Sequence, residues 1–435
     1  MKIPNPSPLV NKFLAAAASN PDSGTAGERN TVERLVTGII FLDKPSPNKI
    51  HEADVTGESK RAFYDHIHDL AQQMPSHFRQ MFSNLQGDPK IAMNGGGFLI
   101  IDEHVIPHSS KHIEGVDKFY STTERGVVLG MSLLAVHYYS ERVDYPVDFD
   151  FYRRYRELEA RGDVTAFEEK NQLARQFFTK FASMKNAPDT WLMDSYFMTK
   201  ENGGLLQHFH KTYISRPKRN WNCNYQGHTY SLYELHDHIP AEDFKLTQVK
   251  NPKTGKRKFY HTATVDVYFA RIGTHRLVLV QCGEATAMDE VIEGNPEILE
   301  APSKNKFRVF VTNNTSWDAS YILSTYSLRW SIETSFQGMN QNLALHGCKW
   351  RELSGQKCFL ALTFMCYLFL SWARVHGELE QYGVKRGTLG QSRRAFRRYC
   401  VEQFAEWLTR LKQQCTECAP ADYIYAHLYD NDAGK

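Results

Sequence analysis

The sequence predicts an α/β protein with a mixed sheet flanked by helices, and three observations lead to this prediction. Helical periodicity gives way to strand-like sequence after two breaks rich in turn-forming residues, at 86–89 and 94–97. Several strands, a charged helix and a further strand then follow, which is the order expected of a mixed sheet. After residue 316 the pattern is helical again.

The N-terminal segment is expected to form a helical domain over residues 1–90. Apolar residues recur there at three- and four-residue steps, as in Val32, Leu35 and Ile39. Residues 45–58 are rich in Pro, Ser, Asn and Gly, so they are predicted to link two helices.

The middle of the chain is predicted to build the sheet. Strands are expected at 98–102, 126–139, 141–149, 190–197 and 307–312, with a helix at 164–184. Sequence rich in β signals also occupies 213–285, with hairpin turns at 251–255 and 272–274. The predicted units after residue 90 are a first part of the core at 91–205, a β-rich insertion at 206–300, a second part of the core at 301–375 and a helical C-terminal region at 376–435.

Composition is that of an ordinary globular chain. Its 435 residues are 42% hydrophobic and 23% charged, which allows two or three domains and gives no sign of disorder. The apolar run at 358–372 is shorter than the ~20 residues that cross a bilayer, so it predicts a buried core helix. With no secretory signal evident, we expect a cytoplasmic protein, free of membranes, with its eight cysteines reduced.

Positive charge is concentrated in three segments that contain no acidic residue: 211–221, 245–258 and 385–398. Such clusters suit a polyanion, although a solvated surface remains the alternative interpretation for any one of them. Aromatic residues next to the first two segments are available to stack on bases. The candidate DNA contacts in these two segments are Arg216, Lys218, Arg219, Lys253, Lys256, Arg257 and Lys258.

Two acids follow apolar strands. Asp102 comes after the run 98–101, and Asp194 comes after 191–193. A buried carboxylate is unfavourable unless it is paired, hydrogen-bonded or bound to a metal. If the two strands are neighbours, the carboxylates repel each other and a divalent cation such as Mg²⁺ would relieve the repulsion. The alternative is that each Asp only caps nearby backbone amides.

A third acid lies in the helix predicted at 318–341. Tyr326, Arg329 and Glu333 are spaced i, i+3 and i+7, so they share one helical face. Arg329 offers a planar fork for phosphate and Glu333 a further carboxylate. In an arbitrary helix the same Arg–Glu spacing is usually a surface salt bridge.

The string from Tyr326 to Asn340 resembles the signature of the YREK class of bacterial and archaeal insertion-sequence DDE transposases. Tyr326, Arg329 and Glu333 match that signature in identity and spacing, whereas Asn340 stands where the class has Lys. Asn can hydrogen-bond a phosphate but cannot neutralise it. The resemblance spans residues 94–370, and the long gap between Asp194 and Glu333 fits the β-rich insertion of these enzymes.

The resemblance implies a ribonuclease H-like core and a two-metal site of Asp102, Asp194 and Glu333. The ions would be Mg²⁺, with Mn²⁺ as the alternative. Implied partners are transposon terminal inverted repeats and target DNA, held by the N-terminal helices, the basic segments and the signature residues Tyr326, Arg329, Trp330 and Asn340. The implied activity is cut-and-paste transposition by a homodimer on nucleoid DNA.

Three alternatives remain at this point. A metal-dependent nuclease would share the fold and cut without joining strands. A DNA-binding protein derived from a transposase would bind without cutting. A structural protein would use its acids only as caps.

Other motifs give weaker hypotheses. Residues 415–418 hold a lone C-x-x-C pair, which is half of a zinc site. His104, His108 and His112 have helical spacing, but Pro107 argues for a loop and against zinc ligands. Neither Cys282 nor Cys348 has an obvious base, so a thiol nucleophile is not expected.

Overall fold

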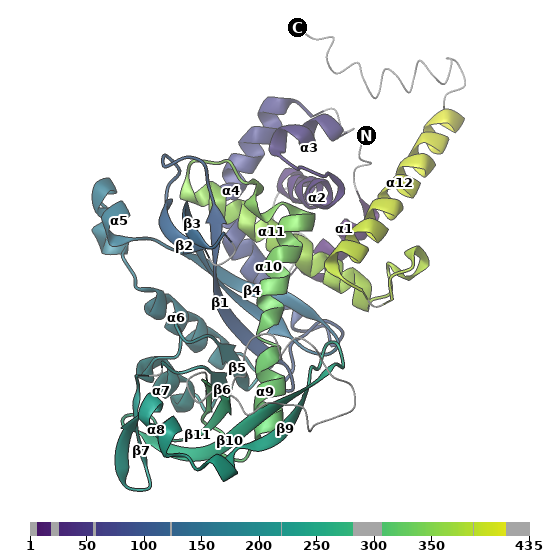
Figure 1. Ribbon diagram of the computed structural model, residues 1–435. Helices are drawn as coiled ribbons and strands as arrows, with labels where there is room; N and C mark the ends of the chain where they lie inside the picture. The colour runs from purple at the N-terminus through teal and green to yellow at the C-terminus, as the bar shows by residue number, and fades with distance from the viewer. Residues whose placement is uncertain are drawn as a thin grey trace.

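The computed structural model describes residues 7–18, 26–54, 58–121, 124–218, 220–281, 307–385 and 387–414. Figure 1 shows two ends to the molecule. A helical end holds both the first helices and the last one, and the opposite end is made mostly of strands. The first core strands lie between the two ends. The C-x-x-C pair, Arg219 and Cys282 lie outside the described residues.

The N-terminal region is helical, as predicted. Its helices are α1 (Pro8–Ala16), α2 (Ala26–Phe41), α3 (Pro47–Ala53) and α4 (Lys60–Leu85). The expected linker at 45–58 instead contains α3, because Ser46 caps it and Pro47 occupies its first turn, where a missing N–H costs nothing. The apolar face of α4 packs on α11 (Leu353–Val375), with the rings of Phe78 and Phe364 5.9 Å apart. The N-terminal helices therefore share a core with the rest of the chain.

The central strands form the mixed sheet that was predicted. They are β1 (Phe98–Pro107), β2 (Asp117–Ser121), β3 (Gly126–Tyr139), β4 (Asp144–Tyr152), β5 (Thr190–Met193) and β6 (Thr212–Ser215). β3 is antiparallel to β1, β2 and β4, while β5 runs parallel to β1 and β6 parallel to β5. The core order is thus β4–β3–β1–β5–β6, with three antiparallel strands on one side and parallel strands on the other.

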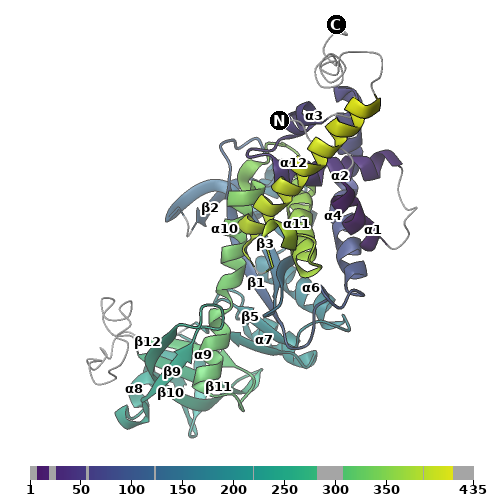
Figure 2. The same ribbon diagram turned by 90° about the vertical axis from the view of Figure 1, so that its right-hand side faces the viewer.

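The β-rich sequence after β6 continues this sheet. Its strands are β7 (Asn222–Tyr225), β8 (His228–Ser231), β9 (Lys245–Lys250), β10 (Arg257–Phe269), β11 (Gly273–Gln281) and β12 (Phe307–Thr312). β12 pairs with β6 on one side and β11 on the other, so hydrogen bonding is unbroken through a sheet of 12 strands among the described residues. The segment predicted as a β-rich insertion is thus hydrogen-bonded to the core sheet, and Figure 2 shows its strands protruding from one end of the molecule.

Helices pack against the sheet and connect its strands. Between β4 and β12 these are α5 (Tyr155–Arg161), α6 (Lys170–Ala182), α7 (Lys200–His208) and α8 (Leu232–His238). After β12 come α9 (Ala319–Ser327), α10 (Trp330–Leu343), α11 and α12 (Leu389–Gln414). The helix predicted at 164–184 is shorter, because a 3-10 turn and a loop precede α6. The single helix predicted at 318–341 is two, α9 and α10, with Leu328 and Arg329 at the junction.

Helix α11 is the core helix predicted from the apolar run. By length and composition alone it is apolar enough to cross a membrane, but 83% of that stretch is buried inside the protein. It contacts α1, α2, α4, α10 and α12 as well as β4. Burial on nearly all sides explains why its sequence is apolar all round.

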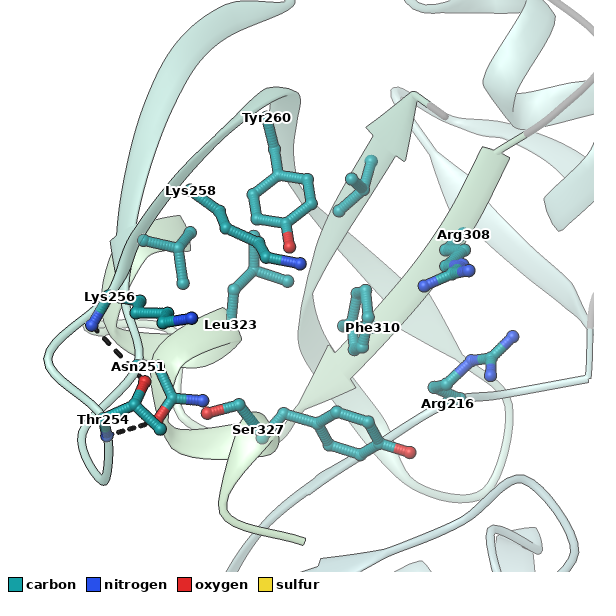
Figure 3. Close-up of a pocket in the computed structure, with 13 residues that line it drawn as sticks. Arg216, Asn251, Thr254, Lys256, Lys258, Tyr260, Arg308, Phe310, Leu323 and Ser327 are labelled. Carbon is teal, nitrogen blue, oxygen red and sulfur yellow. Dashed lines mark hydrogen bonds between the residues drawn. The ribbon is translucent and has the colours of Figure 1, made fainter. Parts of the chain in front are cut away.

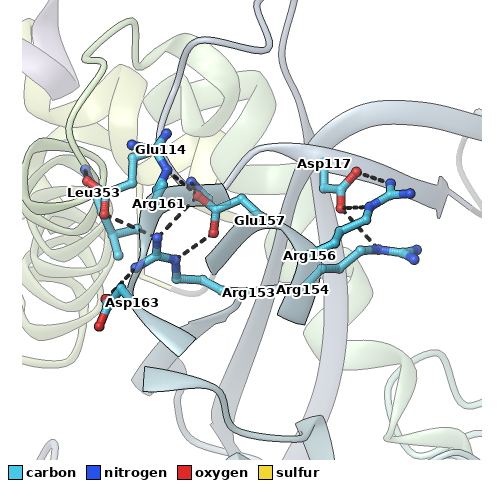
Figure 4. A network of polar contacts seen from close by, with 10 residues as sticks. Glu114, Asp117, Arg153, Arg154, Arg156, Glu157, Arg161, Asp163 and Leu353 are labelled. Carbon is cyan, nitrogen blue, oxygen red and sulfur yellow. Dashed lines mark hydrogen bonds and ion pairs between the residues drawn. The ribbon is translucent and has the colours of Figure 1, made fainter. Parts of the chain in front are cut away.

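An ion-pair network joins α5 to the start of α11 (Figure 4). Glu114, in the loop after β1, accepts a hydrogen bond from the Leu353 N–H at 3.0 Å and lies 3.3 Å from Arg153. Arg153 also pairs with Glu157 at 2.9 Å, and Glu157 accepts the Gly115 N–H at 3.1 Å. Several connections between strands and helices are thereby fixed by charge-assisted hydrogen bonds.

Candidate active site

The first two acids meet because of strand register. β1 and β5 are parallel, and Ile101 lies opposite Met193. Asp102 and Asp194 directly follow those partners, so they lie at neighbouring positions of the two strands. Asp194 comes just after the end of β5, whereas Asp102 is still within β1, which continues to Pro107, so the strand end predicted at residue 102 is wrong. Asp102 is 9% exposed, and Asp194 is half-buried.

Backbone amides hold both carboxylates in place. Asp102 Oδ1 accepts the Glu103 N–H at 2.9 Å. Asp194 Oδ1 accepts the N–H groups of Tyr196 at 2.9 Å and Phe197 at 3.2 Å, which fixes the turn after β5. The capping role considered for Asp194 is therefore real, but it uses only one of its two carboxylate oxygens.

Arg329 connects the third acid to the first. Its Nη1 lies 2.5 Å from Asp102 Oδ2, and its Nη2 lies 2.6 Å from Glu333 Oε1, one helical turn later. Arg329 sits at the junction of α9 and α10, and its side chain is 14% exposed. The Arg–Glu pair of the signature is thus a bridge between two remote parts of the chain and not an isolated surface pair.

The acids influence one another electrostatically. Burial raises the pKa of Asp102 to about 7, and the negative charges of Asp194 and Glu333 add to this, while Arg329 opposes it. Burial also raises the pKa of Asp194, against the hydrogen bonds from Phe197 and Tyr196. The pKa of Glu333 rises through burial and proximity to Asp194, again opposed by Arg329. A nearby cation would stabilise the ionised form of these carboxylates.

Arg329 supplies that cation in this structure. Burial lowers its pKa, but the negative charges of Asp102 and Glu333 outweigh burial and raise it. Within the described residues, no group of three or more Asp, Glu, His or Cys side chains is arranged to hold a metal ion. The donor chemistry still fits a hard divalent ion, because all three acids offer carboxylate oxygens and have raised pKa values that a cation would lower.

A basic and aromatic pocket of about 350 Å³ lies beside this site (Figure 3). Lys256 and Lys258 approach it from the β9–β10 hairpin, and Arg216 and Arg308 lie on the opposite side. Tyr326 forms part of its wall, linking the pocket to the acids. Phe310 lies in the middle in Figure 3, and its ring centroid is 5.0 Å from that of Tyr326.

Tyr326 is held as a neutral phenol. Burial raises its pKa to about 12, against the charges of Arg329 and Arg216. A neutral phenol can donate a hydrogen bond to a phosphate oxygen. The sequence analysis did not predict Arg308 as a DNA contact. A single charged residue within the apolar run of β12 could have indicated it, because Arg308 is the one exposed position of an otherwise buried strand.

The other predicted DNA contacts are dispersed. Lys218 lines a neighbouring pocket that also includes Ser195, next to Asp194. Trp330 is 62% exposed, and both Arg257 and Asn340 are exposed. None of these three lines the basic pocket described above.

Lys253 contacts the core although the β9–β10 turn is exposed. Its ammonium lies 4.8 Å from the ring centroid of Tyr139 in β3, so the tip folds back onto the core. The residues around Lys253 could not have predicted this contact, because Tyr139 is far away along the chain.

The third basic segment has a partly structural role. Arg393 donates to the carbonyls of Ile40 at 2.8 Å and Leu42 at 2.6 Å, at the C-terminal end of α2. Arg397 pairs with Asp43 at 2.9 Å. Arg393 thus satisfies carbonyl groups at the end of a helix, and Arg397 is paired with a carboxylate, so both already have partners within the protein.

The histidines lie differently from our expectation. His104 is within β1 and not in a loop, because the strand continues to Pro107. Its Nε2 is 3.0 Å from Nε2 of His346, and its ring stacks on Phe336. Burial lowers the pKa of His104 to about 3, so the pair is neutral. Burial raises the pKa of Cys348 to about 12, which makes it a poor nucleophile.

Together these features define a class of protein. A mixed sheet with the order found here, one acid within a central strand, a second just after the adjacent parallel strand and a third on a later helix form the arrangement of a ribonuclease H-like, DNA-acting enzyme. The transposase DDE domain family matches residues 96–369, which is more than half of the chain. The chain therefore belongs to the DDE transposases. No curated protein matches it.

Proposed function

We propose that this transposase cuts DNA at the ends of a mobile element and joins the freed 3′-hydroxyl to target DNA, using Asp102, Asp194 and Glu333. The observation that supports this proposal best is the convergence of the three acids around Arg329. They come from β1, the end of β5 and α10, and no requirement of the sheet itself would bring a helix acid to that edge.

The three carboxylates would hold the divalent ions, Mg²⁺ or alternatively Mn²⁺. Bound there, such ions would supply activation of a hydroxyl and charge stabilisation of the leaving oxygen of the phosphodiester. Arg329 can turn from the acids toward a phosphate, since its planar fork binds either kind of oxygen pair. Tyr326 and the four cations of the adjacent pocket would hold the strand backbone, and exposed Trp330 would contact DNA beside the site.

Substitution of each acid tests the catalytic assignment. Asp102→Asn, Asp194→Asn and Glu333→Gln should each abolish Mg²⁺-dependent cleavage of a duplex that contains the terminal inverted repeat. Asp266→Asn is the matched control, because Asp266 is an exposed acid paired with Arg276 far along the sheet, and it should keep activity. Full cleavage by any of the three site variants would refute the assignment.

A second assay separates a transposase from a nuclease of the same fold. Pre-cut ends with a free 3′-hydroxyl should be joined to a supercoiled plasmid in the presence of Mg²⁺. Cleavage without joining would leave the nuclease alternative. DNA binding with neither reaction would leave the non-catalytic alternative.

Assembly and cellular place follow from the same proposal. Joining two ends calls for a homodimer on DNA, acting in the cytoplasm at the nucleoid. Light scattering of the protein with and without end DNA tests the dimer.

A further inference from the structure

A second polar cavity, of about 520 Å³, is lined by α10, the helix that carries Glu333 and is called the catalytic helix below. Lys253 from the β9–β10 turn, Arg374 from α11 and Arg394 from α12 line it. Asp144 at the start of β4 is the one acid that lines it among the described residues. Three elements remote in sequence thus direct cations to one space.

Asp144 is already satisfied by the protein. Tyr367 Oη donates to its Oδ2 at 3.2 Å, and Arg374 lies 3.8 Å from its Oδ1. Burial raises the pKa of Asp144, but His137, Lys253 and Arg374 outweigh burial and hold it at about 2. The acid is therefore ionised and balanced by Arg374. The charges of Lys253 and Arg394 remain in excess, which favours an anionic ligand.

The catalytic helix adds uncharged donors to the same cavity. Thr334, Gln337 and Gln341 are spaced at three and four residues along α10, so they form one face that begins next to Glu333. All three are exposed. Amide and hydroxyl side chains are frequent partners of phosphate and sugar oxygens in protein–DNA contacts.

The two cavities lie at opposite ends of the catalytic segment. Tyr326 lines the basic pocket and Gln337 lines the second cavity, with Arg329 and Glu333 between them. Figures 1 and 2 show α9 and α10 nearly in line. Eleven residues of helix span ~16 Å at about 1.5 Å each, roughly five phosphate steps along one strand of B-form DNA. One strand can therefore reach both cavities with its reacting phosphate at the acids.

The β9–β10 turn forms a wall common to both cavities. Asn251, Thr254 and Lys256 line the basic pocket, whereas Lys253 lines the second cavity. Neighbouring residues of one turn thus face two separate spaces.

We propose that the second cavity binds the sugar–phosphate backbone of duplex DNA beyond the reacting phosphate, with Lys253 and Arg394 contacting phosphate oxygens. This inference rests on the proposed function, because it assumes that the acids act on DNA. The ligand is the phosphodiester backbone, whether it belongs to the element's end or to the target.

Salt-dependent binding of the full chain tests the proposal. Fluorescence anisotropy would follow two labelled 30-bp duplexes in EDTA, one of arbitrary sequence and one with the terminal inverted repeat. Lys253→Gln and Arg394→Gln should each weaken binding ~3–10-fold at 0.1 M salt and lower the slope of log K against log salt by ~0.9, as expected for one lost phosphate contact. Circular dichroism would confirm that each variant is folded.

Two matched variants are the controls. Lys245→Gln changes an exposed lysine of the same hairpin, and Arg398→Gln changes an exposed arginine one turn after Arg394. Neither residue lines the cavity, so both variants should keep the wild-type slope. Equal slopes for all four variants on both duplexes would overturn the proposal.

The pattern of losses also identifies the DNA. Losses on both duplexes support a backbone site common to end and target DNA. Loss confined to the arbitrary duplex supports a target site, and loss confined to the repeat supports an end site. If the wild-type chain binds neither duplex, the proposed function fails with the cavity. If the wild-type chain binds both duplexes and the Lys253→Gln and Arg394→Gln variants bind them equally well, the cavity proposal fails and the proposed function stands.

Discussion

Arg329 shows how one side chain can organise a site. It bridges Asp102 and Glu333, which are separated by most of the sheet in sequence, and it opposes the burial and the repulsion that raise their pKa values. The guanidinium occupies the position between carboxylates that a divalent ion would favour. Metal binding and Arg329 are therefore expected to compete for the same oxygens.

Replacing Arg329 tests this competition. Arg329→Gln should lower the free energy of unfolding by about 2 kcal/mol, because it leaves partly buried carboxylates without a counterion. Millimolar Mg²⁺ should then raise the melting temperature of this variant more than that of the wild type, since no guanidinium has to be displaced. Differential scanning fluorimetry with and without Mg²⁺ measures both effects.

The control is the double variant Asp102→Asn with Arg329→Gln. It lacks one carboxylate, so Mg²⁺ should stabilise it little. An equal response to Mg²⁺ in the single and double variants would contradict the assignment of Asp102 as a ligand.

Glu33 in α2 gives a second prediction at this scale. Burial raises its pKa from 4.5 to about 7, against hydrogen bonds from the Ser7 N–H and Thr37. A raised pKa in the folded state means that its stabilising contribution is complete below pH 4.5 and is lost as the pH rises through about 7. The full shift corresponds to about 3 kcal/mol.

Urea denaturation at pH 5 and pH 8 measures this effect. Glu33→Gln should remove much of the difference in the free energy of unfolding between the two pH values. Glu141→Gln, at an exposed turn, should leave that difference unchanged. A difference equal in wild type and Glu33→Gln would show that Glu33 is not responsible.

At the scale of elements, local sequence predicted strands better than the contacts between elements. β1 and β5 were identifiable because apolar runs end in Asp102 and Asp194, and a buried acid is rare enough to be informative. The break between α9 and α10 could not be identified from the sequence, because neither Leu328 nor Arg329 is Gly or Pro and the helical periodicity continues through them.

The role of α12 was also beyond sequence. Arg393 and Arg397 lie in a basic run, and nothing near them in sequence indicates that α2 ends against them. Charge density alone predicts an anionic partner, whereas the observed partners are carbonyl groups and Asp43.

Arg393→Ala should therefore weaken the fold and not DNA binding. Loss of charge-assisted hydrogen bonds to the carbonyls of Ile40 and Leu42 should cost about 2 kcal/mol of unfolding free energy in urea titrations. Arg398→Ala, on the exposed side of the same helix, should cost less than about 0.5 kcal/mol. A similar loss in both variants would argue against the capping role.

At the scale of the whole molecule, the predicted boundary at residue 90 marks a change of secondary structure. Across it, α4 packs on α11 and the two contribute to one apolar core. Sequence periodicity detected each helix but not its partner, because the two are far apart along the chain.

Truncation tests whether the rest of the chain can fold without the N-terminal helices. A chain beginning at residue 91 leaves the α4-facing side of α11 exposed, so it should show no cooperative thermal transition by circular dichroism. The full-length chain, melted under the same conditions, is the control and should show the cooperative transition. A truncated chain that melted cooperatively at the wild-type temperature would make residues 1–90 an independent domain.

The unbroken sheet has a mechanical consequence. Ser215, the last residue of β6, donates from its hydroxyl to the backbone carbonyls of Met193 at 2.9 Å and Asp194 at 3.0 Å, and β6 is itself bonded to β12 of the protruding strands. A load placed on the distal hairpins by bound DNA would therefore pass through hydrogen-bonded strands to the peptide of Asp194, the proposed catalytic residue. Ser215 is thus the residue through which a force on the protruding strands would reach the main chain of Asp194.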